Sequence, residues 1–172
     1  MPSVEIRRAT AKDASGIARA HVESWGAAYK GIVADELIAA RDLDDRLATW
    51  SAQLERDEPD ARVYIADFDG QVGGFVFTQP CRDEDLTTEQ VAELTALYLR
   101  PAHFGRGAGT ALADAALRDL RKAGFNEVIL WVLEENAGAR RFYERTGWEW
   151  DGTRAPCHRA FNAPALRYRR GL

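Results

Sequence analysis

A glycine-rich turn between a predicted strand and a predicted helix constrains this chain more than any other feature. The apolar residues 97–99 lead through Arg100 and Pro101 to the sequence FGRGAG at residues 104–109, and a helical pattern follows. Glycines let the backbone take up unusual dihedral angles and approach a ligand closely. The free N–H groups at the start of the helix, together with the helix dipole, favour an anion. The turn therefore predicts a site for a phosphate or pyrophosphate group.

Two common nucleotide-binding motifs do not fit this turn. A Walker A loop ends in Gly-Lys-Ser/Thr, and no lysine follows these glycines. A dinucleotide fingerprint GxGxxG counted from Gly105 places Thr110 at its last glycine position. Both interpretations are weakened. A glycine-rich helix start without any ligand stays open as the structural alternative.

Length, charge and composition restrict the class of protein and its partners. The 172 residues suffice for one domain, predicted to span residues 1–172, with 46% apolar and 29% charged residues as in globular proteins. A net charge of −4 disfavours nucleic acid and anionic membranes as partners. The two cysteines lack CxxC spacing and the three histidines are scattered, so we expect no metal site. No signal peptide or membrane-spanning run is visible, which predicts a cytoplasmic location.

Hydrophobic periodicity predicts strands and helices that follow one another around the turn. Strands are expected at residues 4–8, 62–66, 72–77, 91–99 and 128–133, and near 163–169 in the tail. Helices are expected from about 10–13 to 31, at 44–56, from 109 to 124 and from 136 to 147. The Asp69-Gly70 pair predicts a hairpin turn, and residues 80–89 predict a surface loop. This order indicates an α/β (α+β) fold.

The turn resembles the acetyl-CoA-binding motif of the GNAT acetyltransferase superfamily, which reads Gln or Arg, two residues, Gly, one residue, and Gly or Ala. The two glycines fall at Gly107 and Gly109, while Phe104 stands where the family usually has Gln or Arg. Residues 136–144 with 147–148 resemble the family's second conserved block. Residues 7–13 and 25–29 resemble its first strand and first helix. On these motifs, which cover essentially the whole chain, it is identified as a member of the family.

The resemblance implies a single-domain fold with a mixed central sheet of about six to seven strands, about four helices, and a splayed strand pair at the cofactor site. It implies acetyl-CoA (coenzyme A) as the cofactor. Backbone groups of Leu97, Tyr98 and Leu99 would meet the pantetheine arm, and so would Asn136. Phe104 would open the pyrophosphate cradle and act through its backbone. The cradle itself would consist of Gly105, Arg106, Gly107, Ala108, Gly109 and Thr110.

The implied reaction is the direct transfer of an acetyl group from sulfur to a primary amine. Tyr143 matches the tyrosine near the cofactor sulfur, and it is the expected proton donor to the departing thiolate. Asn136 and Tyr143 are seven residues apart, so they project from nearly the same face of a helix. Glu93 lies fourteen residues before Gly107, an offset that resembles the glutamate base of histone-type members.

Strand alternation predicts that Glu93 shares a face with Thr95, Leu97 and Leu99, on the side of the cofactor. The structural alternative is an exposed carboxylate or one bound to an arginine. His21 and a chain of water molecules stay open as other routes for the amine proton.

The acceptor amine, of a small molecule or a peptide, is not identified by the sequence. Trp25, Tyr29 and Trp131 are candidate walls of its pocket, although such residues are more often core residues. An acidic rim would suit polyamines, aminoglycosides or a basic peptide, whereas a basic rim would suit an amino-acid carboxylate. A non-catalytic acetyl-CoA sensor is the alternative function. Members of the family are often dimers, so a homodimer is also considered.

Overall fold

The computed structural model describes residues 4–56 and 58–172, in which seven strands form one mixed sheet in the order β1-β2-β3-β4-β5-β7-β6. The strands are β1 (Val4–Arg8), β2 (Arg62–Phe68), β3 (Gln71–Pro80), β4 (Val91–Leu99), β5 (Glu127–Leu133), β6 (Glu149–Ala155) and β7 (Ala165–Gly171). The helices are α1 (Ala14–Tyr29), α2 (Asp35–Ala39), α3 (Leu43–Glu55), α4 (Ala108–Lys122) and α5 (Ala137–Arg145). None of the described helices is long and apolar enough to cross a membrane.

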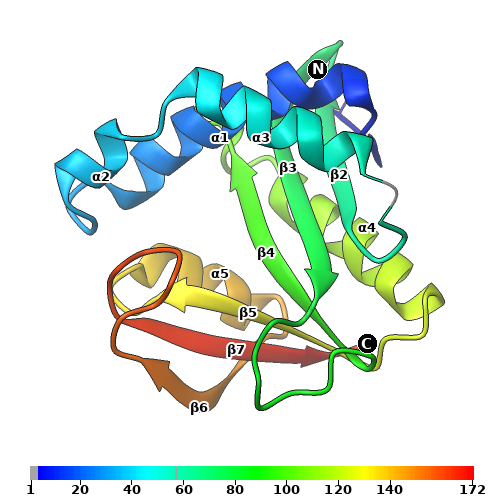
Figure 1. The fold of residues 1–172 in the computed structure, drawn as a ribbon, viewed down its shortest axis with the longest axis vertical. Coiled ribbons are helices and arrows are strands. Elements are labelled where there is room, and N and C mark those ends of the chain that lie inside the picture. The colour runs from blue at the N-terminus through cyan, green and yellow to red at the C-terminus, as the bar shows by residue number, and fades with distance from the viewer. Residues whose placement is uncertain (1–3, 57) are drawn as a thin grey trace.

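The sheet opens in the middle, between β4 and β5. These two strands pair in parallel only where residues 91–93 meet residues 127–129, and all other strand pairs are antiparallel. Beyond that short ladder the two strands diverge into a V (Figure 1). β5 meanwhile stays paired with β7 along its whole length. The expected splayed strand pair is therefore confirmed, and it leaves one edge of each strand facing the gap.

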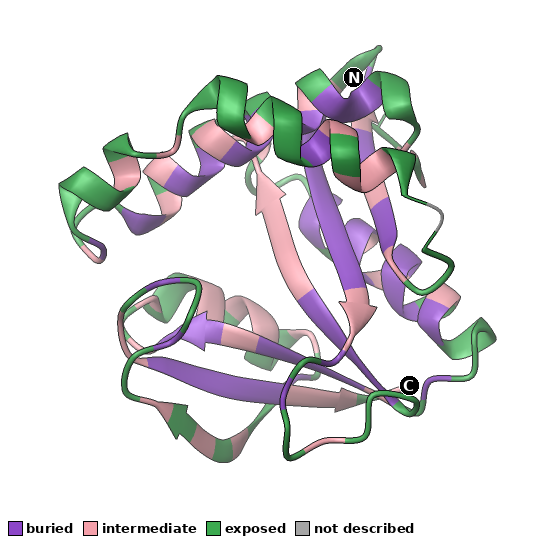
Figure 2. Cartoon of the chain, in the orientation of Figure 1, coloured by how far each residue is buried: buried purple, intermediate pink, exposed green. Residues whose placement is uncertain are grey.

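Helices cover both faces of the larger half of the sheet. α4 packs on one face, where Leu112, Ala116 and Leu120 join Val76 and Leu94 in a buried cluster. α1 and α3 cover the opposite face around a second cluster that includes the side chains Ile17, Trp50, Ile65 and Phe75. The buried strands lie between these helices (Figure 2). Burial of both sheet faces explains the long apolar runs in the central strands.

The expected strands and longer helices are found close to their predicted positions. Asp69 and Gly70 both have positive φ angles, 53° and 86°, as a two-residue hairpin turn with left-handed residues requires. β6 was not assigned by the sequence pattern because none of its residues is buried, and the five-residue α2 likewise has no buried residue. The loop expected at residues 80–89 is only partly a surface loop, since Cys81 and Asp83 are buried.

A β-bulge at Thr95 changes which side chains of β4 share a face. Phe77 pairs with Ala96, but the next residue, Thr78, pairs with Leu94, so Thr95 is an extra residue on β4. As a result Leu94 and Leu97 both contact the core beneath α4, while Ala96 and Tyr98 contact the core beneath α1 and α3. The expectation that Glu93 shares a face with Leu97 and Leu99 is wrong, because the extra residue reverses the alternation.

Candidate active site

The glycine turn forms an open cradle at the start of α4. Gly105 and Gly107 have φ angles of 73° and 77°, and Gly107 is the N-cap of the helix. Within the described residues, none of the six amide N–H groups at positions 105–110 has a hydrogen-bond acceptor. No atom would lie within 4 Å of a Cβ added at Gly105 or Gly107. Six free donors at a helix start fit a pyrophosphate group.

The residues in and beside the cradle differ in their exposure to solvent. Ala108 and Gly109 are buried in the first turn of α4, while the Arg106 side chain is exposed beside it. Phe104 is 55% exposed, and its own amide N–H is already bound to the carbonyl of Pro101. Phe104 therefore contributes no free backbone donor, and the anion site begins at Gly105.

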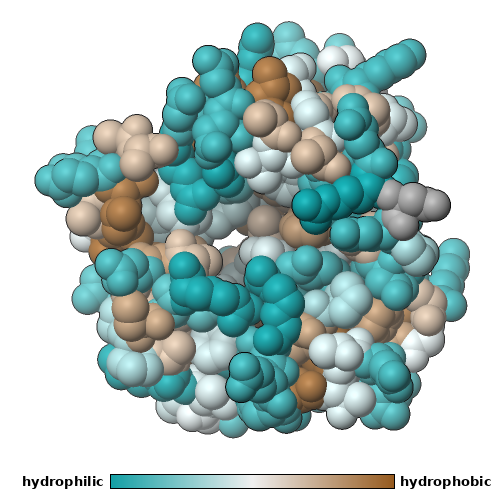
Figure 3. Space-filling view, viewed as in Figure 1, coloured by the Kyte–Doolittle hydropathy of each residue, from teal (hydrophilic) through white to brown (hydrophobic). Residues whose placement is uncertain are grey.

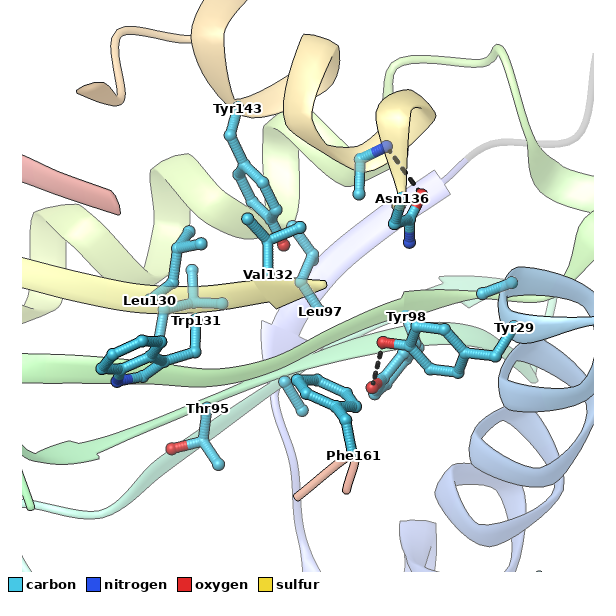
Figure 4. A pocket seen from close by; sticks show the side chains of 14 residues that line it. Tyr29, Thr95, Leu97, Tyr98, Leu130, Trp131, Val132, Asn136, Tyr143 and Phe161 are labelled. Atoms are coloured by element: carbon cyan, nitrogen blue, oxygen red, sulfur yellow. Dashed lines mark hydrogen bonds between the residues drawn. The ribbon is translucent and has the colours of Figure 1, made fainter. Parts of the chain in front are cut away.

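A narrow cleft of about 100 Å³ continues from the open edges of β4 and β5. Leu97 and Tyr98 line it from β4, Leu130 and Val132 line it from β5, and Figure 4 shows the close-up. Leu99 does not line it, and its carbonyl accepts a hydrogen bond of 2.7 Å from Ser24 Oγ. On the molecular surface a hollow separates the half that carries α1 to α3 from the half that carries β5 to β7 (Figure 3). The cleft suits an extended, pantetheine-like chain.

Helix α5 places two of the expected cofactor residues on this cleft. Asn136 caps the helix, with its side-chain oxygen accepting a hydrogen bond of 3.1 Å from the amide of Ala139. Tyr143 extends from the same helix toward Leu97 and Val132 (Figure 4). Burial, with a smaller effect of Tyr98, raises the pKa of the Tyr143 hydroxyl. That hydroxyl therefore keeps its proton at neutral pH and is a donor rather than a base.

The three aromatic residues expected at the acceptor pocket lie around the other side of the cleft. Tyr29 and Trp131 line the cleft, and Trp25 lines the next cavity. The hydroxyls of Tyr29 and Tyr98 are 3.0 Å apart, and burial raises the pKa of Tyr98 to about 12. Trp131 Nε1 donates to Asp83 Oδ2 over 3.0 Å. Trp25 and Tyr29 are also core residues, because both are almost fully buried.

A second cavity, of about 200 Å³, adjoins the cleft and contains His21. His21 Nδ1 accepts a hydrogen bond of 3.1 Å from Trp50 Nε1, and its ring stacks on Tyr98 at 5.3 Å. Burial, aided by the nearby Arg41 charge, lowers the pKa of His21 to about 3. The hydrogen bond assigns the remaining proton to Nε2. In this arrangement His21 has no free lone pair with which to accept the proton of an amine.

Glu93 is not brought to the cleft. Its side chain is buried, and its two carboxylate oxygens accept hydrogen bonds from Arg82 at 2.9 and 3.0 Å and from Arg159 at 3.3 and 3.4 Å. It is not among the residues that line the cleft or the His21 cavity. Tyr143 and Asn136 thus line the cleft together with residues of β4, whereas Glu93 lies outside it and is bound by two arginines. The role of Glu93 as a base stays a prediction.

The loop between β6 and β7 contributes residues that the sequence pattern did not single out. Phe161 lines the cleft, the His21 cavity and a further cavity next to it. Its ring stacks on that of Trp25, with the centroids 5.8 Å apart. His158 is only 5% exposed, and its ring packs against Trp131 with the centroids 4.9 Å apart. No periodicity marks residues of a loop, so the sequence offered no signal for their approach to α1.

The sequence matches the model of the acetyltransferase (GNAT) family over residues 22–148. It is 30% identical over 134 residues to an uncharacterised N-acetyltransferase of Bacillus subtilis (strain 168), a match that covers 77% of this chain and 73% of that protein. It is 31% identical over 142 residues to an uncharacterised N-acetyltransferase of Mycobacterium tuberculosis, covering 83% and 86% of the two chains. The chain therefore belongs to the GNAT acetyltransferase family. It is an N-acetyltransferase whose acetyl donor is acetyl-CoA, as its motifs indicate.

Solved structures confirm the expected fold. The PaiA N-acetyltransferase of Thermoplasma acidophilum, determined in complex with coenzyme A, superposes with a TM-score of 0.81 at 22% identity and 99% coverage of both chains. The YncA acetyltransferase of Salmonella typhimurium, determined with its cofactor acetyl-CoA, has a TM-score of 0.73 at 22% identity, with 99% and 94% coverage. At these identities the likeness establishes the architecture shared by the chains.

Proposed function

We propose that this chain transfers the acetyl group of acetyl-CoA directly to a primary amine of a small molecule or peptide, within the cleft between β4 and β5. One observation carries the proposal. The open amide cradle at residues 105–110 lies at the start of α4, and the cleft beyond it leads to an aromatic cavity. These features fit, in order, a pyrophosphate, a pantetheine arm and an acceptor.

The protein's own groups would hold the cofactor through its phosphates and its arm. The free amides at 105–110, with Arg106 as a nearby cation, would bind the pyrophosphate. Asn136 and the unpaired edge of β4 near Leu97 and Tyr98 would bind the arm. When bound, the cofactor supplies an activated acetyl thioester. The narrow cleft orients the two reactants, which can lower a barrier by several kcal/mol.

Two protons must move, and the residues differ in their ability to move them. Tyr143 holds its proton at the hydroxyl oxygen and would donate it to the departing thiolate. An alkylammonium has a pKa near 10.4, so the acceptor must lose a proton before it reacts. His21 and Glu93 are both engaged by protein partners, which favours loss of that proton to water in the cavity. A cytoplasmic location and a homodimer stay predictions.

A thiol-release assay over a panel of amines tests the proposal. With acetyl-CoA present, we expect CoA release that depends on the acceptor and equals the amount of N-acetyl product formed. The tight binding of acetyl-CoA without acceptor-dependent release would instead assign the sensor function. Calorimetry with acetyl-CoA, ATP and NAD provides the control for ligand class, and a preference for ATP or NAD would overturn the proposal.

A further inference from the structure

The two cavities beside the cleft are lined by cations. The His21 cavity, of about 200 Å³, and a larger cavity next to it, of about 290 Å³, have five lining residues in common: Trp25, Arg41, Arg46, Ala160 and Phe161. Arg159 adds a third guanidinium to the larger cavity. Among the described residues, no aspartate or glutamate lines either cavity. Although the chain as a whole is acidic, the space next to the cleft is locally basic.

Arg41 is held at the cavity wall by an aromatic ring and not by an ion pair. Its guanidinium carbon lies 3.6 Å from the ring centroid of Trp25, a cation–π contact that holds the group in place. Within residues 4–56 and 58–172, no carboxylate forms an ion pair with Arg41. Burial and the repulsion of Arg46 lower the pKa of Arg41. Two guanidinium groups that repel each other at a cavity wall would gain from an anion placed between them.

Arg46 offers a donor that has no partner. It is paired through one terminal nitrogen with its exposed chain neighbour, Asp45. Its Nε, however, is buried and has no hydrogen-bond acceptor in the part of the chain that the structure describes. A buried N–H without an acceptor is costly, so a ligand oxygen at this position would recover that free energy.

The His21 cavity and the cleft lie next to each other. Both are lined by Thr95, Ala96, Tyr98 and Phe161. A molecule whose anionic end is bound by the two arginines would therefore have its other end next to the cleft, where transfer takes place. Between these ends it would contact the aromatic rings of Trp25, Trp50 and Phe77.

We propose that the acceptor is a small primary amine that also carries a carboxylate, with Arg41 and Arg46 binding the carboxylate while the amine enters the cleft. The aromatic walls favour an apolar side chain on such a molecule, as in an apolar amino acid. The planar fork of an arginine matches the two oxygens of a carboxylate. A polyamine would bring like charge to the same wall and is disfavoured. This inference rests on the proposed acetyltransferase function.

The test compares amines that share a side chain and differ in the presence of the carboxylate, with kcat/KM calculated for the unprotonated amine. Phenylalanine and leucine are assayed against phenylalaninamide and leucinamide, with spermidine as a polycation. We expect kcat/KM for each acid to exceed that for its amide by at least about tenfold, the range of one charge-assisted hydrogen bond. Arg41→Gln and Arg46→Gln should each lower kcat/KM for the acids by about 10- to 100-fold and for the amides by much less, with KM for acetyl-CoA unchanged.

The matched control is Arg118→Gln, which removes one exposed arginine from α4, on the other face of the sheet. Arg41→Lys, which keeps the charge but loses the fork, should fall between the wild type and Arg41→Gln. Thermal melting of each variant verifies that it is folded. Amides or spermidine that react as well as the acids would overturn this inference while supporting the acetyltransferase function. An absence of CoA release with every amine would overturn the acetyltransferase proposal itself.

Discussion

Gly107 combines two requirements at a single residue. Its φ of 77° is a conformation that other residues adopt only at a cost, and its amide belongs to the open cradle. We expect Gly107→Glu to weaken acetyl-CoA binding by more than about 100-fold, because a carboxylate would face the phosphates at short range in addition to the backbone cost. Calorimetric titration with acetyl-CoA measures the change.

Gly124 supplies the matched control for this substitution. It also has a positive φ, 95°, and open space around its Cβ position, but it follows the C-terminal end of α4. Gly124→Glu therefore carries a similar backbone cost and the same added charge far from the cradle. Equal losses of affinity in the two variants would show that backbone strain, and not the anion site, is responsible.

Substitution of Tyr143 should affect turnover without affecting cofactor binding. Its raised pKa keeps the hydroxyl protonated, so removal of that hydroxyl removes an acid and leaves the ring packing intact. Tyr143→Phe should lower kcat by about 100-fold, the lower range for general acid catalysis, with little change in acetyl-CoA affinity. Steady-state kinetics with calorimetry separates the two quantities, and an unchanged kcat would exclude Tyr143 as the acid.

At the scale of elements, the bulge in β4 decides the position of Glu93. It leaves Glu93 on the opposite face of β4 from Leu97. There Arg82 and Arg159 bind the carboxylate. We therefore expect Glu93→Gln to lower kcat/KM by less than about tenfold, since both carboxylate oxygens are bound by arginines and the side chain does not line the cleft. The pH profile of kcat/KM should keep its shape. A fall of about 100-fold with loss of the acidic limb would instead establish Glu93 as the base.

The bulge in β4 is one feature that the sequence did not predict. Periodicity located the central strands because Val128, Ile129 and Leu130 are buried on both faces, and glycines located the turn at Gly107. Periodicity did not predict β6, because none of its residues is buried. It also cannot detect an extra residue within a strand. Asn136 and Tyr143, which the motif placed on one helix face, both line the cleft, whereas Glu93 does not. Arg41 and Arg46 are close in sequence, but only the tertiary fold places them at the cavity beside the cleft.

For the whole molecule, the three histidines predict how stability depends on pH. Burial lowers the pKa of His21 to about 3 and of His158 to about 4, and burial also lowers the pKa of His103. In the unfolded chain a histidine titrates near 6.5. Below that pH the unfolded chain binds protons that the folded chain excludes, so falling pH favours unfolding. The stabilisation is complete above pH 6.5 and is lost progressively as the pH falls through the folded pKa values.

The window from pH 6.5 to 4.5 lies below the unfolded value of histidine and above the titration of Asp13 in either state, which runs from 3.8 in the unfolded chain to about 2 in the folded chain. Urea unfolding across the window should show a free energy of unfolding that falls with pH, by up to about 1.4 kcal/mol per pH unit from His21. His21→Gln keeps an acceptor for Trp50 Nε1 but cannot titrate, so its slope should be shallower than that of the wild type. Because His158 and His103 titrate in both proteins, the difference in slope belongs to His21 alone. Identical slopes would mean that His21 takes up its proton at the same pH in the folded and unfolded chains, and its place as a neutral hydrogen-bond acceptor between Trp50 and Tyr98 would be wrong.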